Sequence, residues 1–212
     1  MNLTKRLNAI VSLIDECTNV IDVGCDHALL DIYLTLNNKN KCIASDINEN
    51  ALKGAKNNIK KYNLEEKIKV IVSDGLKNID IPSNNTIVIC GMGTNTILNI
   101  IKTNDINKID SLIIQSNNDL YLLRKSLVNL GFYIEKEINL EDKNKYYTII
   151  KLKKGKRKYN HFEYYYGINL KNKEFIQHLI NKNKKIIVSL PKKYFIKKIK
   201  YKIHNIYLKK QI

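Results

Sequence analysis

Acidic residues stand at the ends of three short apolar segments of this chain, as Asp22, Asp46 and Asp74. If these segments are parallel strands, their carboxyl ends meet at one edge of a sheet, where open α/β sheets bind ligands. An acid after the second strand can bind ribose hydroxyls, and one after the third can accept a hydrogen bond from an adenine amino group. Each acid alone could instead cap a helix, but the three together predict a nucleoside-binding edge.

The stretch VIDVGCDHALL, Val20 to Leu30, combines a short strand, a turn at Gly24 and the start of a helix. Nicotinamide dinucleotides and S-adenosylmethionine both bind at such an entrance. A dinucleotide requires a second glycine and no anion beside the pyrophosphate, yet Asp26 and Ala28 occupy those positions. A carboxylate attracts the sulfonium and ammonium of S-adenosylmethionine, so the turn favours the methyl donor. Asp26 as a cap of the following helix is equally compatible with that cofactor.

A second glycine-rich turn, Gly91-Met92-Gly93, follows the apolar segment TIVIC. Glycines there either let a flat base approach the backbone or serve only the turn. Cys25 and Cys90 end neighbouring strands, where they either flank a pocket or fill the core as small apolar side chains. His27 is interpreted as a helix-start residue rather than a base.

The periodicity of apolar residues predicts the elements that position these turns. Strands alternate with amphipathic helices up to residue 130, and a two-strand hairpin follows, which together predict a Rossmann-like doubly wound α/β sheet with an antiparallel edge. The N-terminal helix is expected at Leu3 to Cys17 and five strand-helix units follow it. The strands are expected at 20–23, 42–44, 68–72, 86–90, 111–114, 132–138 and 146–152.

The charge is divided sharply along the chain. Residues 1–150 hold 18 Lys and Arg against 18 Asp and Glu, whereas residues 151–212 hold 19 against two, so the whole net charge of +17 lies in the last segment. Codon bias toward lysine would spread the excess evenly. The partition therefore predicts a cofactor-binding domain at 1–155 and a basic, polyanion-binding domain at 156–212.

The basic segment carries two helical stripes, separated by Pro191. The stripes predict a coiled-coil-like helical hairpin with lysines facing outward, and Tyr164, Tyr165 or Tyr166 available to stack on bases. A lysine-rich face that is merely solvated is the alternative interpretation. The expected seam residues are Phe175, Leu179, Ile186 and Leu190 on the first helix and Ile196, Ile199, Ile203 and Ile206 on the second.

Other features limit the cellular setting. The N-terminus lacks the apolar core of a signal peptide, and no apolar run has membrane-spanning length. The four cysteines are scattered without a C-x-x-C pair, so neither a zinc site nor a disulfide framework is indicated. We expect a cytoplasmic monomer without a metal ion.

Six motifs occur in order: VIDVGCDHALL, ASDIN (44–48), SDGL (73–76), ICGMGT (89–94), IIQSN (113–117) and EDKNKYY (141–147). With the opening NLTKRLNAI, they resemble the bacterial tRNA (adenine-22-N1)-methyltransferase family over the whole chain. The chain departs from the family at Thr94, where a further glycine is usual, and it has no N-P-P-Y loop.

The resemblance implies a class I methyltransferase domain that uses S-adenosylmethionine to methylate N1 of adenine 22, in the D-loop region of tRNA. It implies that Gly24 and Asp26 bind the methionine part of the donor, that Asp46 binds the ribose and that Asp74 binds the adenine. Gly91, Met92 and Gly93 would border the target base, with Asp26 as the candidate catalytic group. The other residues expected at the cofactor are Asp22, Cys25, His27, Ile47, Gly75 and Cys90.

Two other functions fit the same residues. A nicotinamide-dependent oxidoreductase has the same fold, although Asp26 and Ala28 disfavour it. An RNA-binding protein with a degenerate cofactor pocket would keep the basic segment and need none of the strand-end acids.

Overall fold

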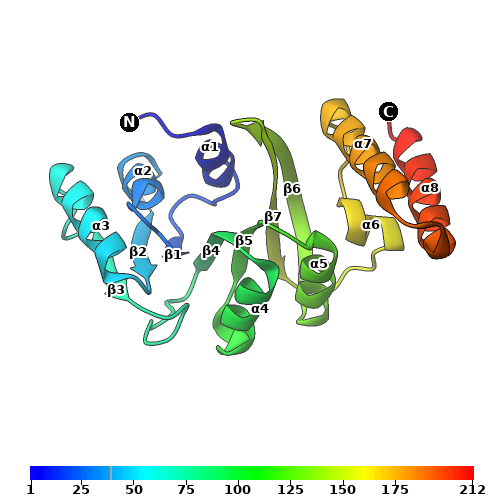
Figure 1. The fold of residues 1–212 in the computed structure, drawn as a ribbon. Coiled ribbons are helices and arrows are strands. Elements are labelled where there is room, and N and C mark those ends of the chain that lie inside the picture. Colours follow the sequence, from blue (N-terminus) through cyan, green and yellow to red (C-terminus); the bar gives the residue numbers. More distant parts are fainter. Residues whose placement is uncertain (39) are drawn as a thin grey trace. The chain divides into compact units, whose positions relative to one another are not determined.

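The computed structural model describes residues 1–38 and 40–212, which form two compact units, Met1–Lys158 and Tyr159–Ile212. The N-terminal unit is built on a seven-stranded sheet of order β3-β2-β1-β4-β5-β7-β6 (Figure 1). The strands are β1 (Asn19–Val23), β2 (Lys41–Asp46), β3 (Ile68–Val72), β4 (Asn85–Met92), β5 (Ser111–Ser116), β6 (Phe132–Asp142) and β7 (Lys145–Lys154).

Five parallel strands and two antiparallel edge strands confirm the predicted fold class. β1 pairs in parallel with both β2 and β4, and β7 runs antiparallel to β5 and β6. The central strands are apolar on both faces because helices cover both. The apolar segment Thr86 to Ile89 of β4 is buried throughout.

Helices pack on the two faces of this sheet. Residues of α1, α2 and α3 share one core cluster with Val20, Val88 and Ile113, whose side chains point to the same face. Figure 1 shows α4 and α5 on the other face. The helices are α1 (Lys5–Val11), α2 (Leu29–Asn37), α3 (Glu49–Lys61), α4 (Thr94–Lys102), the 3-10 turn η1 (Ile106–Lys108) and α5 (Leu120–Asn129).

Two predicted helical segments differ from the structure. The N-terminal helix spans only Lys5–Val11, because Thr4 caps its start and the backbone continues beyond Ser12 as turns that bury Leu13. Residues 73–84, between β3 and β4, contain no helix. Gly75 there has a φ of +65° and Pro82 follows, and both disfavour a helix.

The C-terminal unit is a helical hairpin with a short aromatic helix. It comprises α6 (His161–Tyr166), α7 (Lys173–Ser189), the 3-10 turn η2 (Lys192–Tyr194) and α8 (Phe195–Lys209), with α7 and α8 side by side (Figure 1). Tyr166 is buried between them, and its hydroxyl lies 2.7 Å from Nδ1 of His204. Asn183 donates to that hydroxyl and to Asn205 Oδ1.

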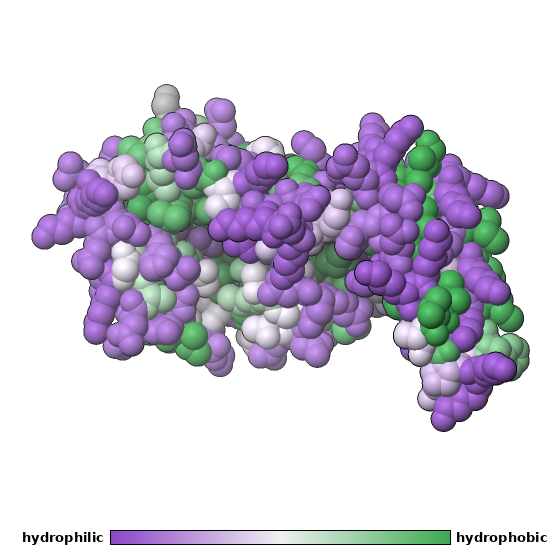
Figure 2. Space-filling view, turned by 45° about the horizontal axis from the view of Figure 1, so that its top comes forward, coloured by the Kyte–Doolittle hydropathy of each residue, from purple (hydrophilic) through white to green (hydrophobic). Residues whose placement is uncertain are grey.

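The predicted seam was right in part on α7, where Phe175 is buried and Leu179 packs against the core, and it was wrong on α8. On α8 the buried positions are His204, Asn205 and Leu208, whereas Ile199 and Ile203 are about half exposed. The reason is α6, an element that the periodicity did not predict, whose aromatic residues pack in the core with Leu208 of α8. Figure 2 accordingly shows apolar surface among the hydrophilic side chains of this unit. No helix in the described ranges is long and apolar enough to span a membrane.

A buried ion pair joins α5 to the edge strand β6. Arg124 Nε lies 2.7 Å from Glu137 Oε1, and the two side chains are 1% and 0% exposed. Charges so far from water are stable only when they are paired, and removing one partner leaves the other uncompensated. This contact fixes α5 on the sheet.

We expect Arg124→Met to lower the free energy of unfolding by about 3–5 kcal/mol, because it removes a cationic partner of the buried Glu137 carboxylate. The double variant with Glu137→Leu should regain most of that loss. Urea denaturation followed by circular dichroism measures both. Lys125→Met, one residue along on the exposed face of the same helix, is the matched control. A loss in Arg124→Met no larger than in the control would contradict this role.

Candidate active site

The first turn and the Gly91-Met92-Gly93 turn meet at the carboxyl edge of the sheet. β1 and β4 are neighbours, and the chain order reverses between them, which makes this the topological switch point. Gly24 has a φ of +80°, and a Cβ there would lie 2.6 Å from Met92 Cε. The two predicted loops are thus in contact, and glycine is required at the turn.

Two backbone donors of the first turn are already used. The amides of Gly24 and Cys25 both donate to the carbonyl of Ser45 at the end of β2, over 2.8 and 3.0 Å. A pyrophosphate site needs amides directed at the ligand. The bonding of these two amides to Ser45 disfavours a dinucleotide.

Asp26 does not cap the following helix, so that interpretation was wrong. The N-cap of α2 is Ala28, which makes no side-chain capping bond. The Asp26 side chain is 73% exposed, and its nearest charged partner is His27, 3.7 Å away. Both Asp26 and Ala28 have positive φ, a strained backbone that directs the Asp26 carboxylate outward.

A cleft of about 120 Å³ opens beside this turn. Its polar lining includes the basic residue Arg6 and the acidic residues Asp22 and Asp26. Burial raises the pKa of the Cys25 and Cys90 thiols, so both are neutral walls rather than nucleophiles. The lining comprises Arg6, Leu7, Ile10, Asp22, Gly24, Cys25, Asp26, His27, Leu29, Leu30, Val88 and Cys90.

Arg6 is a site residue that the sequence analysis did not identify. Its Nη1 donates to Gln115 Oε1 at 3.2 Å, and its guanidinium lies 5.3 Å from the ring centroid of Tyr147. Its backbone amide donates to Asp142, so the tip of the β6–β7 hairpin holds α1 over the cleft. The sequence could have drawn attention to Arg6 by its residue type, because only three of the 37 cationic residues are arginines.

Asp31 is the second site residue that was missed. It lies fully buried on α2, and neither carboxyl oxygen receives a hydrogen bond from a fixed donor in the described ranges. The group that faces it is the Asp22 carboxyl, and two carboxyls can bond only by sharing a proton. Burial, with Asp31 nearby, raises the pKa of Asp22 well above its ordinary value, and burial raises the pKa of Asp31 to about 7.

The neighbouring strand ends hold the other predicted residues outside the cleft. Asp46 accepts from the amide of Asn48, and Ile47 beside it is 67% exposed, an unusual position for isoleucine. Asp74 pairs with Lys77 at 2.7 Å, partly satisfying its carboxylate. A Cβ at Gly75 would lie 2.9 Å from Ile100 of α4, so this glycine serves packing.

The Gly91-Met92-Gly93 loop is held by the end of β5. Gly91 is exposed with a φ of +86°, and its carbonyl accepts from Asn117 Nδ2 at 2.6 Å. Thr94 donates its amide to Asn118 Oδ1 at 2.8 Å, and its hydroxyl lies 2.9 Å from Ser116 Oγ. Thr94 thus ties the loop to β5 by side-chain bonds that a glycine lacks.

His27 lies across α3 rather than into the cleft centre. A Cβ at Gly54 would be 2.8 Å from His27 Nδ1, so the glycine in the middle of α3 makes room for the ring. Asn58 of the same helix donates to the His27 carbonyl at 3.0 Å. The helix α2 begins at Leu29 with Ala28 as its N-cap, so His27 lies in the turn before the helix and not at its start.

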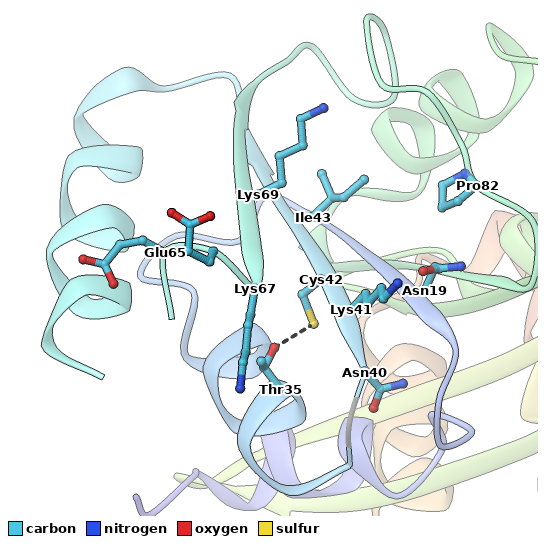
Figure 3. Close-up of a pocket in the computed structure, with 11 residues that line it drawn as sticks. Asn19, Thr35, Asn40, Lys41, Cys42, Ile43, Glu65, Lys67, Lys69 and Pro82 are labelled. Atoms are coloured by element: carbon cyan, nitrogen blue, oxygen red, sulfur yellow. Dashed lines mark hydrogen bonds between the residues drawn. The ribbon is translucent and has the colours of Figure 1, made fainter. Parts of the chain in front are cut away.

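A larger hollow of about 790 Å³ lies at the amino ends of the strands (Figure 3). Asn19 and Lys41 begin β1 and β2 there, so the hollow is on the opposite edge from both glycine turns. Its lining mixes three lysines with the two acids Glu65 and Glu66. Size alone therefore does not identify the site.

Comparisons with known proteins show that the chain is similar to methyltransferases. Residues 3–150 match the family described as a methyltransferase domain. A tRNA (adenine(22)-N(1))-methyltransferase of Bacillus subtilis is 30% identical over 160 residues, covering 74% of this chain and 67% of that protein. The structure of M. capricolum TrmK with S-adenosyl-homocysteine is 34% identical over 98% of each chain, with a TM-score of 0.87. The B. subtilis m1A22 tRNA methyltransferase TrmK is 26% identical over 100% of this chain and 99% of that one, with a TM-score of 0.79.

The acid pair predicts a pH dependence of stability. Asp31 binds its proton more tightly when folded, with a pKa of about 7 against 3.8, so its stabilising contribution is complete below pH 3.8 and is lost as pH rises through 7. We expect Asp31→Asn to be more stable than the parent at pH 8 by roughly 2–4 kcal/mol, with the gap closing toward pH 4. Urea denaturation across this range measures it.

Asp80→Asn, on an exposed residue, is the control and should give a small difference independent of pH. Parallel pH profiles for the parent and Asp31→Asn would contradict the shared proton.

Proposed function

The chain belongs to the tRNA (adenine-22-N1)-methyltransferase family, and on that premise we propose that it methylates N1 of adenine 22 in tRNA with S-adenosylmethionine. The observation that carries the proposal is the cleft at the switch point. Carboxyls and a guanidinium line it, while the amides of Gly24 and Cys25 are bonded to Ser45 and not to a ligand. A cationic, phosphate-free cofactor fits such a site.

The residues present match the chemistry of this cofactor. Its methionine part carries an ammonium and a carboxylate, which suit the acidic Asp22 and Asp26 and the basic Arg6 of the cleft. We assign the ribose hydroxyls to Asp46. We assign the adenine of the cofactor to the exposed side chain of Ile47 and the strand end at Asp74-Gly75. The neutral thiols of Cys25 and Cys90 line the cleft.

When bound, S-adenosylmethionine supplies an electrophilic methyl group. Adenine N1 bears a free lone pair, so the chain has no proton to remove beforehand, and its task is alignment and exclusion of water. We assign the approach of the base to Gly91, Met92 and Gly93, which Asn117 holds in place. The methylated base is cationic, and the outward carboxylate of Asp26 would stabilise the developing charge.

We propose that residues 1–155 bind the cofactor and that residues 156–212 bind tRNA. The support is charge, because 17 of the 19 Lys and Arg in residues 151–212 have no acidic counterpart in that segment. A tRNA substrate and four free cysteines further support a cytoplasmic enzyme. We propose that it acts as a monomer and without a metal ion.

The direct test is methyl transfer to tRNA. We expect the protein, incubated with tRNA and labelled S-adenosylmethionine, to produce N1-methyladenosine at position 22. A tRNA with guanine at that position should remain unlabelled. Asp46→Ala should weaken cofactor binding by roughly 10- to 100-fold, since it removes a charged hydrogen-bond acceptor. A folded protein that binds cofactor yet yields no N1-methyladenosine would exclude the activity, and absence of cofactor binding would favour a simple RNA-binding protein.

A pair of glycine variants tests the cofactor cleft. Gly24 and Gly131 both have positive φ, but a Cβ at Gly131 meets nothing within 4 Å. Each alanine variant should lose about 1–2 kcal/mol of stability from backbone strain. Only Gly24→Ala should also lose affinity for S-adenosylhomocysteine, roughly 10- to 100-fold by calorimetry, because its methyl crowds Met92. Equal affinities in the two variants would disprove the assignment of the turn to the cofactor.

A further inference from the structure

The C-terminal unit contains a pocket of its own, on α6, η2 and α8. It has a volume of about 540 Å³, within the usual range of ligand pockets of about 300–1,000 Å³. We call it the α8 pocket, and it is lined by Tyr165, Lys193, Tyr194, Ile196, Lys197, Lys200 and Tyr201. Three aromatic rings and three ammonium groups therefore surround one space.

The lysines of the α8 pocket face no acidic lining residue. The C-terminal unit contains only Glu163 and Glu174, and neither lines the pocket. Glu163 is bonded to the backbone amide of Asn160 in the capping box of α6. The pocket therefore attracts anions, and its field is not cancelled locally.

The aromatic rings are arranged together with the cations. Tyr194 ends η2 directly before α8, Tyr201 lies within α8, and both line the pocket together with Lys197. Lys200 Nζ donates to the Tyr165 hydroxyl at 2.6 Å and lies 4.8 Å from its ring centroid. Tyr194 is 47% exposed, so its ring is accessible.

This alternation matches the chemistry of an unpaired nucleotide. Flat bases stack on tyrosine rings irrespective of sequence, and the flanking phosphates bind lysine. A duplex offers phosphates but no exposed base face, and an acidic peptide needs no stacking surface. Tyr166, expected to be available for stacking, is buried against His204 and Asn183 and takes no part.

We propose that the α8 pocket binds one unpaired nucleotide of the tRNA substrate, with its base on Tyr194 and Tyr201 and its phosphates on the surrounding lysines. The proposal rests on the proposed function for the identity of the RNA. The pocket is a binding site separate from the catalytic cleft, since all its residues belong to the C-terminal unit. Its effect is on the affinity for tRNA and not on the chemical step.

The test uses the full chain and measures tRNA affinity by fluorescence anisotropy. Tyr194→Ala should weaken binding roughly tenfold, and Tyr194→Phe, which keeps the ring, should restore it. Lys197→Gln should lower both the affinity and, by about one, the slope of log K against log salt. A single-stranded oligoribonucleotide should compete with tRNA at the parent protein better than a duplex of equal length, and the preference should vanish in Tyr194→Ala.

Lys61→Gln and Tyr62→Ala provide the matched controls, since they alter an adjacent exposed lysine and tyrosine at the end of α3 in the other unit. Neither should change tRNA affinity, and all variants should bind S-adenosylhomocysteine like the parent. Unchanged tRNA affinity in Tyr194→Ala, or failure of Tyr194→Phe to restore it, would contradict the proposal that the α8 pocket binds a nucleotide. If the parent binds tRNA through this pocket but forms no N1-methyladenosine, the proposed function fails and the pocket stands.

Discussion

The parallel pairing of β1 with β4 is the constraint on which the site depends. Its register sets Val23 beside Ile89, so Gly24 and the Gly91-Met92-Gly93 segment, which both follow this pair, come together at the carboxyl edge of the sheet. Met92 then closes on Gly24, where there is no room for a side chain. A shift of this register would separate the turns, because strand pairing and not direct bonding brings them together.

The electrostatics of the cleft follow from the same geometry. Asp22 is an inner residue of β1, so its carboxyl is drawn into the sheet, where it meets Asp31 rather than water. Two buried carboxyls cannot both be ionised at low cost, and one shared proton leaves a single negative charge. Arg6 adds a positive charge to the lining of the same cleft from α1, and that helix is itself held by the β6–β7 hairpin. The antiparallel edge thereby contributes to the site from a distance in sequence.

The sequence predicts those features that recur along the chain at regular intervals. Strand ends recur at regular intervals, so the sheet and the alignment of Asp22, Asp46 and Asp74 were accessible to pattern. Arg6 acts through partners far away in sequence, whereas Asp31 meets Asp22 of the preceding strand, and no apolar period marks either contact. The prediction of the buried residues on α8 was wrong for a different reason, because the short helix α6 supplied a competing apolar surface.

The separation of charge between the units solves a conflict between the two proposed ligands. A cationic methyl donor needs carboxylates in its cleft, and those carboxylates repel the phosphates of tRNA. The adenine that must enter the cleft is neutral, so it can approach acidic residues while its backbone cannot do so favourably. Lysines concentrated in the last quarter of the chain would bind the phosphates away from the acids. An even distribution of the same charges would have weakened both interactions.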